Sequence, residues 1–272
     1  DLTIKGSNDF DGAIWALDSL SLNRCTVSEN RTGVYGGGTF IAKDSHFVSN
    51  DTAIDSGGVV ILIDSIIAEG NVGIELQRGA DLSVFHCTLK DNGNAIHGWS
   101  DIRVNIRNSL LVRNGYSSIY GGASAVEIDN YDGPAAFLSI VGSSIVDGPG
   151  GGIALHGSVD VTVVRSTISG NSSSVSLAYP SVVPGESSLN LRDSTIVGTP
   201  GTSNFIIWAR DGEPTTRFAT VAIKNSIIAG SSYQSPNCEV TPVDYTTLNV
   251  DFVSQAFNIS DDDSCGLDDP KD

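Results

Sequence analysis

The sequence has no methionine, few basic residues and no long hydrophobic run. No stretch approaches the roughly 18 to 20 unbroken apolar residues of a transmembrane helix, so we expect no transmembrane segment. Residues that favour long helices are scarce, whereas Gly, Ser, Thr, Val, Ile, Asn and Asp are abundant, which favours strands and turns. No signal peptide is visible and the first residue is Asp, which indicates a mature, processed or trimmed chain.

Positive charge is scarce as well. The chain of 272 residues carries 15 Lys and Arg against 32 Asp and Glu, for a formal net charge of −17. Because binding to a phosphate backbone requires a basic face, we expect no nucleic-acid partner. Such acidity keeps a protein soluble and attracts cations. The length suffices for one large domain with a sizeable core.

The sequence contains one short motif that recurs nine times, as in "RSTISGN" at residues 165–171. Each copy has a small residue, then any residue, then an aliphatic residue or Phe, and then a polar turn. Apolar residues also recur three and five positions before each small residue, and this alternation predicts two short strands around a bend. The small residues are Cys25, Ser45, Ser65, Cys87, Ser109, Ser143, Ser166, Ser194 and Ser226.

A third short strand opens each unit, as in "GIEL" at residues 73–76 and "GIAL" at residues 152–155. Three short strands per repeat form one coil of a parallel β-helix, and each coil must stack on the next to bury its inner face. We therefore predict an all-β solenoid of about nine coils around a solid core. Asparagines at similar turn positions are expected to hydrogen-bond along the stack. They are Asn30, Asn50, Asn71, Asn114 and Asn171.

The repeat predicts a solenoid over residues 1–231 and an irregular C-terminal cap or tail over residues 232–272. Insertions within 116–135, 178–188 and 209–217 predict loops that project from the rod. Leu2 and Ile4 fit the inward positions of a corner strand, so the chain is expected to begin within a coil. Because unpaired strand edges recruit other strands, we expect any self-association, by end-to-end stacking, at the N-terminal end.

The four cysteines fall into two pairs. Cys25 and Cys87 share one inward column but lie three coils, or ~14 Å, apart. A disulfide needs Cα atoms within about 7 Å, so we predict free, buried thiols. Cys238 and Cys265 both lie in the tail, where a disulfide is the favoured interpretation and implies an oxidising compartment. A zinc site is the alternative, although no CxxC pair or paired His accompanies these cysteines.

Other cofactors are not expected. The acidic run at residues 261–263 lacks EF-hand spacing, so we interpret it as a solvated charge cluster, with weak Ca²⁺ binding as the alternative. No metal site is predicted elsewhere in the chain.

The coil pattern, "NC" at 237–238 and "AFNISDDDSCGL" at 256–267 together resemble a family of bacterial surface proteins. These are right-handed parallel β-helix repeat proteins of the CSLREA or choice-of-anchor type, whose tails resemble G-x-N-x-x-x-D-x-S-C-G. Asn258, Asp262, Ser264, Cys265 and Gly266 match that line, whereas Ala256 replaces its first glycine. The resemblance implies a right-handed coil, secretion and surface attachment of the full-length protein, at the exterior of a bacterial cell.

Two outward columns are predicted on the opening strands, and they contain all the candidate site residues. The candidate ligand-binding residues are Asp55, Glu75, Gln77, His97, Trp99, Glu127, Asp129 and His156. Carboxylates beside an aromatic platform suit a sugar-binding or glycoside-cleaving groove, and the catalytic candidates are Glu75, His97, Glu127 and Asp129. Because the outward positions of any solenoid are usually polar, a plain solvated face is the alternative interpretation.

Two hypotheses for function follow. The favoured one is a secreted or cell-surface scaffold, adhesin-like, that binds glycans or surface proteins or stacks end to end. The alternative is a polysaccharide lyase or glycoside hydrolase that acts on the outward face of the middle coils. The chain has "IHG" and "LHG" but lacks the N-T-D and R-I-K motifs typical of polygalacturonases, and it has no G-x-S-x-G elbow. The absence of a complete catalytic motif favours the scaffold.

Overall fold

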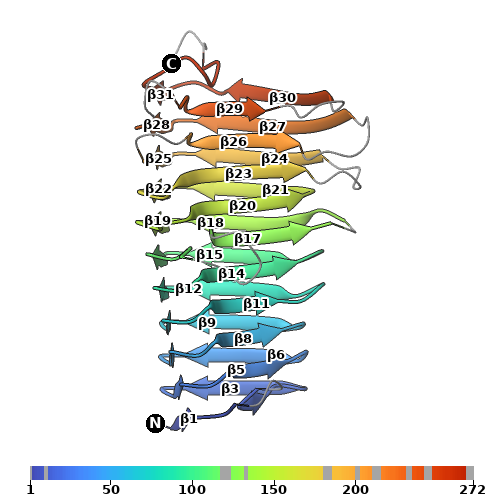
Figure 1. Ribbon diagram of the computed structural model, residues 1–272, viewed down its shortest axis with the longest axis vertical. Coiled ribbons are helices and arrows are strands. Elements are labelled where there is room, and N and C mark those ends of the chain that lie inside the picture. Colours follow the sequence, from blue (N-terminus) through green and yellow to red (C-terminus); the bar gives the residue numbers. More distant parts are fainter. Residues whose placement is uncertain are drawn as a thin grey trace.

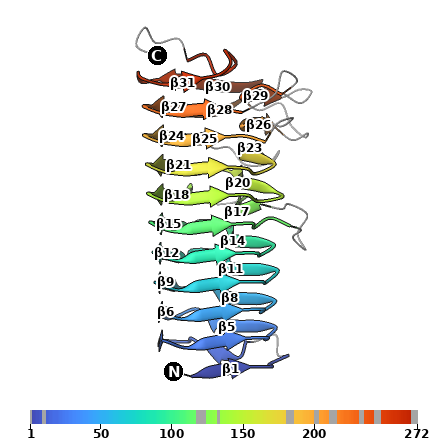
Figure 2. The ribbon, with the colours of Figure 1, turned by 90° about the vertical axis from the view of Figure 1, so that its left-hand side faces the viewer.

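The computed structural model describes residues 2–8, 12–116, 124–131, 134–179, 186–199, 203–209, 216–230, 235–241 and 247–267. These residues form a tall stack of short strands, with the N-terminal strands at one end and the C-terminal strands at the other (Figures 1 and 2). No helix among them is long and apolar enough to cross a membrane. Most of the residues inserted in the three predicted loops lie outside the described ranges.

The strands form three parallel sheets, and consecutive members of each sheet are three strands apart in the chain. The first sheet contains β1 (Thr3–Lys5), β4 (Thr26–Ser28), β7 (His46–Val48), β10 (Ile66–Ala68), β13 (Thr88–Lys90), β16 (Leu110–Val112), β19 (Ser144–Val146), β22 (Thr167–Ser169), β25 (Thr195–Val197), β28 (Ile227–Ala229) and β31 (Ile259–Ser260). The second contains β2 (Ile14–Trp15), β5 (Thr32–Gly36), β8 (Thr52–Ser56), β11 (Val72–Leu76), β14 (Asn94–Trp99), β17 (Ser124–Asn130), β20 (Gly151–Gly157), β23 (Ser173–Tyr179), β26 (Phe205–Ala209) and β29 (Cys238–Thr241). The third contains β3 (Ser19–Asn23), β6 (Thr39–Lys43), β9 (Val59–Ile63), β12 (Asp81–Phe85), β15 (Arg103–Arg107), β18 (Ala136–Val141), β21 (Val159–Val164), β24 (Glu186–Arg192), β27 (Thr216–Lys224) and β30 (Thr247–Ser254).

This period-three order is that of a parallel β-helix of about ten coils, so the predicted all-β solenoid is confirmed. Each coil passes through the second sheet, the third sheet and the first sheet in turn. At ~4.8 Å per strand, the first sheet spans roughly 50 Å. The predicted apolar columns fill the interior: Val27, Phe47, Ile67 and Leu89, for example, are fully buried in successive coils.

The bottom of the core differs from prediction in one residue. Ile4 aligns with Val27 as expected, but Leu2 is 56% exposed rather than inward and buried. Among the described residues only one neighbouring coil lies against this position, so the side chain lacks cover on its other side.

The recurrent small residue is explained by the corner between the third and first sheets. The residue just before it has a left-handed backbone in every copy, with φ near 50° at Arg24, Asp44 and Asp64, for example. The backbone N–H of Ser45 then donates to Oγ of Ser65, whose own hydroxyl donates to the carbonyl of Ile63. A small side chain with an oxygen or sulfur can make both contacts inside the corner, and the same ladder runs along the whole stack. It satisfies buried polar groups at a bend that costs non-glycine residues roughly 1 kcal/mol or more.

The predicted asparagine column lies at the next corner, although the prediction was wrong at Asn71 and missed Asn92. Asn50 Oδ1 accepts hydrogen bonds from the backbone N–H and the side chain of Asn30. In the third coil, however, Gly70 occupies this position and donates its N–H to Asn92 Oδ1. Asn71, which was predicted to belong to the column, lies one residue later, is exposed and donates to Asp51. Strand pairing before and after the turn shows that it has the same length as the preceding one, so Gly70 corresponds to Asn50 and Asn71 corresponds to Asp51.

The C-terminal segment is more regular than predicted. Instead of an irregular tail, residues 238–260 contain β29, β30 and β31, which add one strand to each sheet. Cys238 and Cys265 form the expected disulfide, with Cα atoms 5.0 Å apart. Cys25 and Cys87 are free and buried, as predicted, and burial raises the pKa of the Cys87 thiol. The disulfide indicates that the protein folds in an oxidising compartment.

A larger side chain at the corner between the third and first sheets should test which residues point inward there. Replacing Ser109 with leucine should lower the free energy of unfolding by roughly 1 to 3 kcal/mol, because Ser109 is only 6% exposed and the corner has no room. The neighbouring change, Leu110→Ser, affects a side chain that is 38% exposed and should cost far less. Urea titration of both variants measures the difference, and equal losses would contradict the register.

Candidate functional site

The predicted outward columns lie on the outer face of the second sheet. Strand pairing places Trp15 beside Tyr35, Tyr35 beside Asp55, and Asp55 beside Glu75. Farther along the stack, the pairing places His97 beside Glu75 and Glu127. These positions alternate with buried core residues, so the columns were predicted in the correct register.

The N-terminal half of this face is open to solvent. Trp15 is 51% exposed and Tyr35 is 37% exposed, and their rings pack edge to face with centroids 5.8 Å apart. Next to Tyr35, the half-buried Asp55 accepts a hydrogen bond of 3.0 Å from the exposed Gln77. Burial raises the pKa of Asp55, the hydrogen bond from Gln77 offsets part of this, and the negative charge of Glu75 adds to the rise.

The middle of the same face is buried rather than solvated, which corrects the expectation of an open polar patch. Glu75 is 6% exposed, His97 1% and Asp129 6%. His97 Nδ1 lies 2.8 Å from Glu75 Oε2, and its Nε2 lies 3.2 Å from Asp129 Oδ2. Trp99 donates its indole N–H to Glu75 Oε1 at 2.6 Å and packs edge to face on the His97 ring. The four side chains therefore form one hydrogen-bonded chain across three coils.

This geometry determines the charge of His97. Both ring nitrogens face carboxylates, and both contacts are hydrogen bonds only when both nitrogens carry protons. Burial lowers the pKa of His97, but the hydrogen bonds to Asp129 and Glu75 outweigh it and raise the pKa to about 9. At neutral pH His97 is therefore an imidazolium between two carboxylates. It is not the neutral imidazole that a general base requires, which weakens its candidacy as a catalytic residue.

A second group of side chains adjoins the first on the next coils. His156 Nδ1 lies 2.9 Å from Asp129 Oδ1, and the Tyr131 hydroxyl lies 3.0 Å from each of these atoms. Asn94 donates its amide to Glu127 Oε2 at 2.7 Å. Burial raises the pKa of Glu127, the bond from Asn94 offsets part of this, and the charge of Asp129 raises it further. Burial also raises the pKa of Asp129, but hydrogen bonds from His156 and His97 outweigh it and lower the pKa overall.

The structure therefore separates the eight predicted ligand-binding residues into two groups. Asp55 and Gln77 remain accessible beside the aromatic pair, whereas the other six gather in the buried or partly buried middle. Asn94 and Tyr131 belong to the middle group but were missed. Asn94 lies at the start of its strand, outside the two columns. The equivalent positions in the two preceding coils hold Val and Thr, so an amide side chain at this position could have indicated a polar contact.

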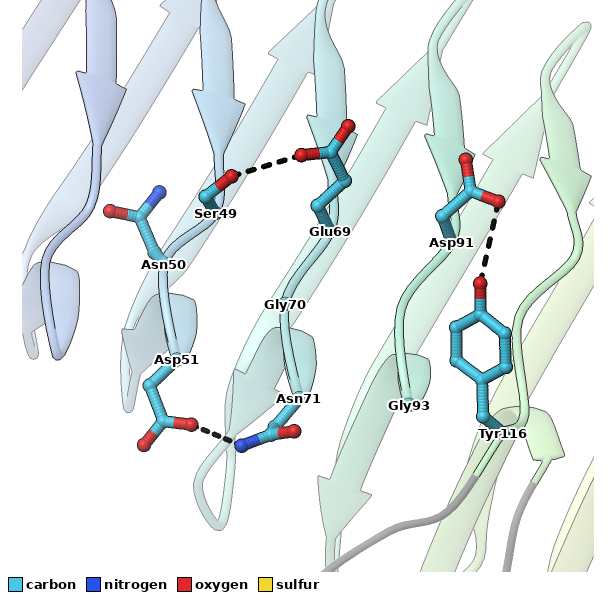
Figure 3. A pocket seen from close by; sticks show the side chains of 9 residues that line it. All are labelled: Ser49, Asn50, Asp51, Glu69, Gly70, Asn71, Asp91, Gly93 and Tyr116. Carbon is cyan, nitrogen blue, oxygen red and sulfur yellow. Dashed lines mark hydrogen bonds between the residues drawn. The ribbon is translucent and has the colours of Figure 1, made fainter.

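A shallow hollow that the columns did not predict lies at the corner between the first and second sheets (Figure 3). Ser49 donates to Glu69 Oε2 at 3.0 Å across its floor, and the Tyr116 hydroxyl points to Asp91. Arg113 holds the pKa of Asp91 low through two hydrogen bonds of 2.7 and 2.8 Å. The lining residues are Ser49, Asn50, Asp51, Glu69, Gly70, Asn71, Asp91, Gly93 and Tyr116. The acidic residues Glu29, Glu69 and Asp91, which occupy the same turn position in three of the coils, could have indicated this acidic edge.

Comparison with protein-family models, with curated proteins and with solved structures gives no match. The β-helix itself is shown by the three sheets, and the bacterial surface-protein family that the sequence resembles is not identified by these comparisons. The function must therefore be argued from the surface and the clusters described above.

Proposed function

We propose that the protein is an extracellular or cell-surface scaffold that binds carbohydrate on the N-terminal half of the second sheet. The observation that supports this best is the exposed pair of Trp15 and Tyr35, which shares one parallel ladder with Asp55. Asp55 in turn accepts a hydrogen bond from Gln77, just after β11. Aromatic rings that remain solvent-exposed on a rigid sheet offer an apolar face with a polar neighbour.

The chemistry of this patch fits a neutral sugar chain. The aromatic rings can cover the apolar C–H face of a pyranose, while Asp55 and Gln77 can bind its hydroxyl groups. Neighbouring coils repeat at ~4.8 Å, so an extended oligosaccharide can contact several of them. Because the chain carries a formal net charge of −17, it should disfavour acidic polysaccharides.

The proposed location rests on separate evidence. The disulfide indicates an oxidising compartment, and the sequence resemblance points to the surface of a bacterial cell. A long β-helix suits a spacer that presents a binding face away from its attachment point.

The test is glycan binding by surface variants. We expect Trp15→Ala and Tyr35→Ala each to weaken binding of the best neutral oligosaccharide from an array by about tenfold or more in calorimetry. Phe137→Ala is the matched control, because Phe137 is 44% exposed on the third sheet, and it should bind like the wild type. Absence of binding to any neutral oligosaccharide, or equal affinities of wild type and both variants, would refute the proposal.

A second candidate is the polysaccharide lyase or glycoside hydrolase. It draws support from Glu127 and Asp129, neighbouring carboxylates whose pKa values shift in opposite directions. Against it stands their burial, since a substrate must reach both groups. Incubation with acidic and neutral polysaccharides, followed by assays for new reducing ends and unsaturated uronates, separates the two functions. Turnover that Glu127→Gln abolishes would replace the scaffold with the enzyme.

A further inference from the structure

Three metal-ligating side chains converge on the outer face of β17 and β20. Glu127, Asp129 and His156 each offer one ligand atom, and these atoms all lie within 4.8 Å of one another. In a tetrahedral site with bonds of about 2.0 to 2.2 Å, ligand atoms are roughly 3 to 3.5 Å apart. The present positions thus require movements of about an ångström to surround one cation, which side-chain rotation can supply.

The two carboxylates are already oriented by neighbours that would form the outer shell of such a site. His97 contacts Asp129 through Oδ2, at 3.2 Å, and Asn94 contacts Glu127 through Oε2, at 2.7 Å. Each carboxylate thereby has one oxygen fixed, and the second oxygen of Asp129 lies 2.9 Å from His156 Nδ1 and accepts a hydrogen bond from the Tyr131 hydroxyl. Ligating carboxylates in metal sites are usually held by hydrogen bonds in this way.

Charge and hydrogen bonding also leave a place for a cation. Glu127 is 3% exposed, yet among the described residues its hydrogen bond comes from a neutral amide and no Lys, Arg or His forms an ion pair with it. Buried carboxylates are normally paired or bound to metal. Asn94 is 1% exposed, its side chain is directed at Glu127, and its Oδ1 has no hydrogen-bond partner within the described ranges. The amide therefore holds Glu127 through its N–H group and keeps one buried oxygen beside the cluster without a partner in the described residues.

We propose that Glu127, Asp129 and His156 bind one divalent transition-metal cation, for which Zn²⁺ is the best fit. An imidazole with carboxylates suits Zn²⁺, whereas Ca²⁺ takes six to eight oxygens and no nitrogen. No metal was predicted here from the sequence, because the ligands lie on two strands, β17 and β20, that belong to successive coils. The cation would join β17 to β20 and so tie two successive coils together. This site is independent of the proposed carbohydrate surface.

Zinc titration of the whole chain tests the proposal. After dialysis against EDTA and then chelator-free buffer, calorimetry with ZnCl₂ should show one site per chain, and Zn²⁺ should raise the melting temperature where CaCl₂ does not. Substitution of cobalt should give the visible absorption of a site with nitrogen and oxygen ligands. We expect His156→Ala and Glu127→Gln each to weaken Zn²⁺ binding by about 10- to 100-fold or more.

The matched control is His86→Ala, because His86 is exposed, lies 3.6 Å from Asp64 and follows a strand of the third sheet, two coils before β17. This variant should bind Zn²⁺ like the wild type and should keep the thermal shift. Circular dichroism checks that each variant is folded, and His156 is the safer substitution since its side chain is 25% exposed. Failure to bind one equivalent of Zn²⁺, or equal binding by wild type and His156→Ala, would overturn the site.

Discussion

Replacing His97 with phenylalanine should lower the free energy of unfolding by about 3 to 5 kcal/mol, measured by urea titration in EDTA. Phenylalanine fills a similar volume, so the loss has an electrostatic cause. Glu75 and Asp129 have side chains only 8% exposed, and His97 is the imidazolium that contacts both. Removing one partner of a buried ionic group leaves the remaining charges without compensation, which is more costly than losing a surface pair.

Two further variants separate this cause from simple loss of packing. The triple variant Glu75→Gln, His97→Phe, Asp129→Asn removes every charged side chain from this hydrogen-bonded group. Much of the lost stability should therefore return. His86→Phe removes an exposed histidine beside Asp64 and should cost less than about 1 kcal/mol, because water already screens that pair. A His97→Phe protein within 1 kcal/mol of the wild type would contradict the buried ionic arrangement.

The repeat predicted the fold well because every coil obeys the same two constraints. A corner needs a small polar side chain, and the inner face needs apolar residues at fixed offsets, so Ser109, Leu111 and their equivalents appear in each copy. The last coil was not recognised because it breaks these constraints. Asn258 replaces the small corner residue and accepts the hydrogen bond from the Ser226 N–H. Because the repeat was recognised by its small corner residue, the larger amide in this position kept the tenth repeat from being identified.

The candidate site was predicted less completely, for a different physical reason. Alternation along a strand shows which side chains point outward, but it does not show whether they are covered. Glu75 and Asp55 are neighbours in one column, yet one is buried and the other is half-buried. The contacts that set the charge of His97 come from residues 22 and 32 positions away. Such contacts depend on how the side chains of stacked coils turn toward one another, which the alternation along a strand does not specify.

Removing the disulfide should open the last coil while the rest of the solenoid remains folded. Closing a loop with a sequence separation of 27 is worth about 3.5 kcal/mol in the chain-entropy account. Cys238 begins β29 and Cys265 follows β31, so the bond closes the final coil on itself. Because a solenoid coil contacts only its neighbours, the loss should be local.

In the double variant Cys238→Ala, Cys265→Ala, we expect amide protons of β29, β30 and β31 to exchange about 100-fold faster or more, with little change near β11. Cys87→Ser is the control, since serine occupies most equivalent corner positions and should leave exchange unchanged in all four strands. Unaltered protection of the last coil in the double variant would show that packing alone holds the C-terminal end.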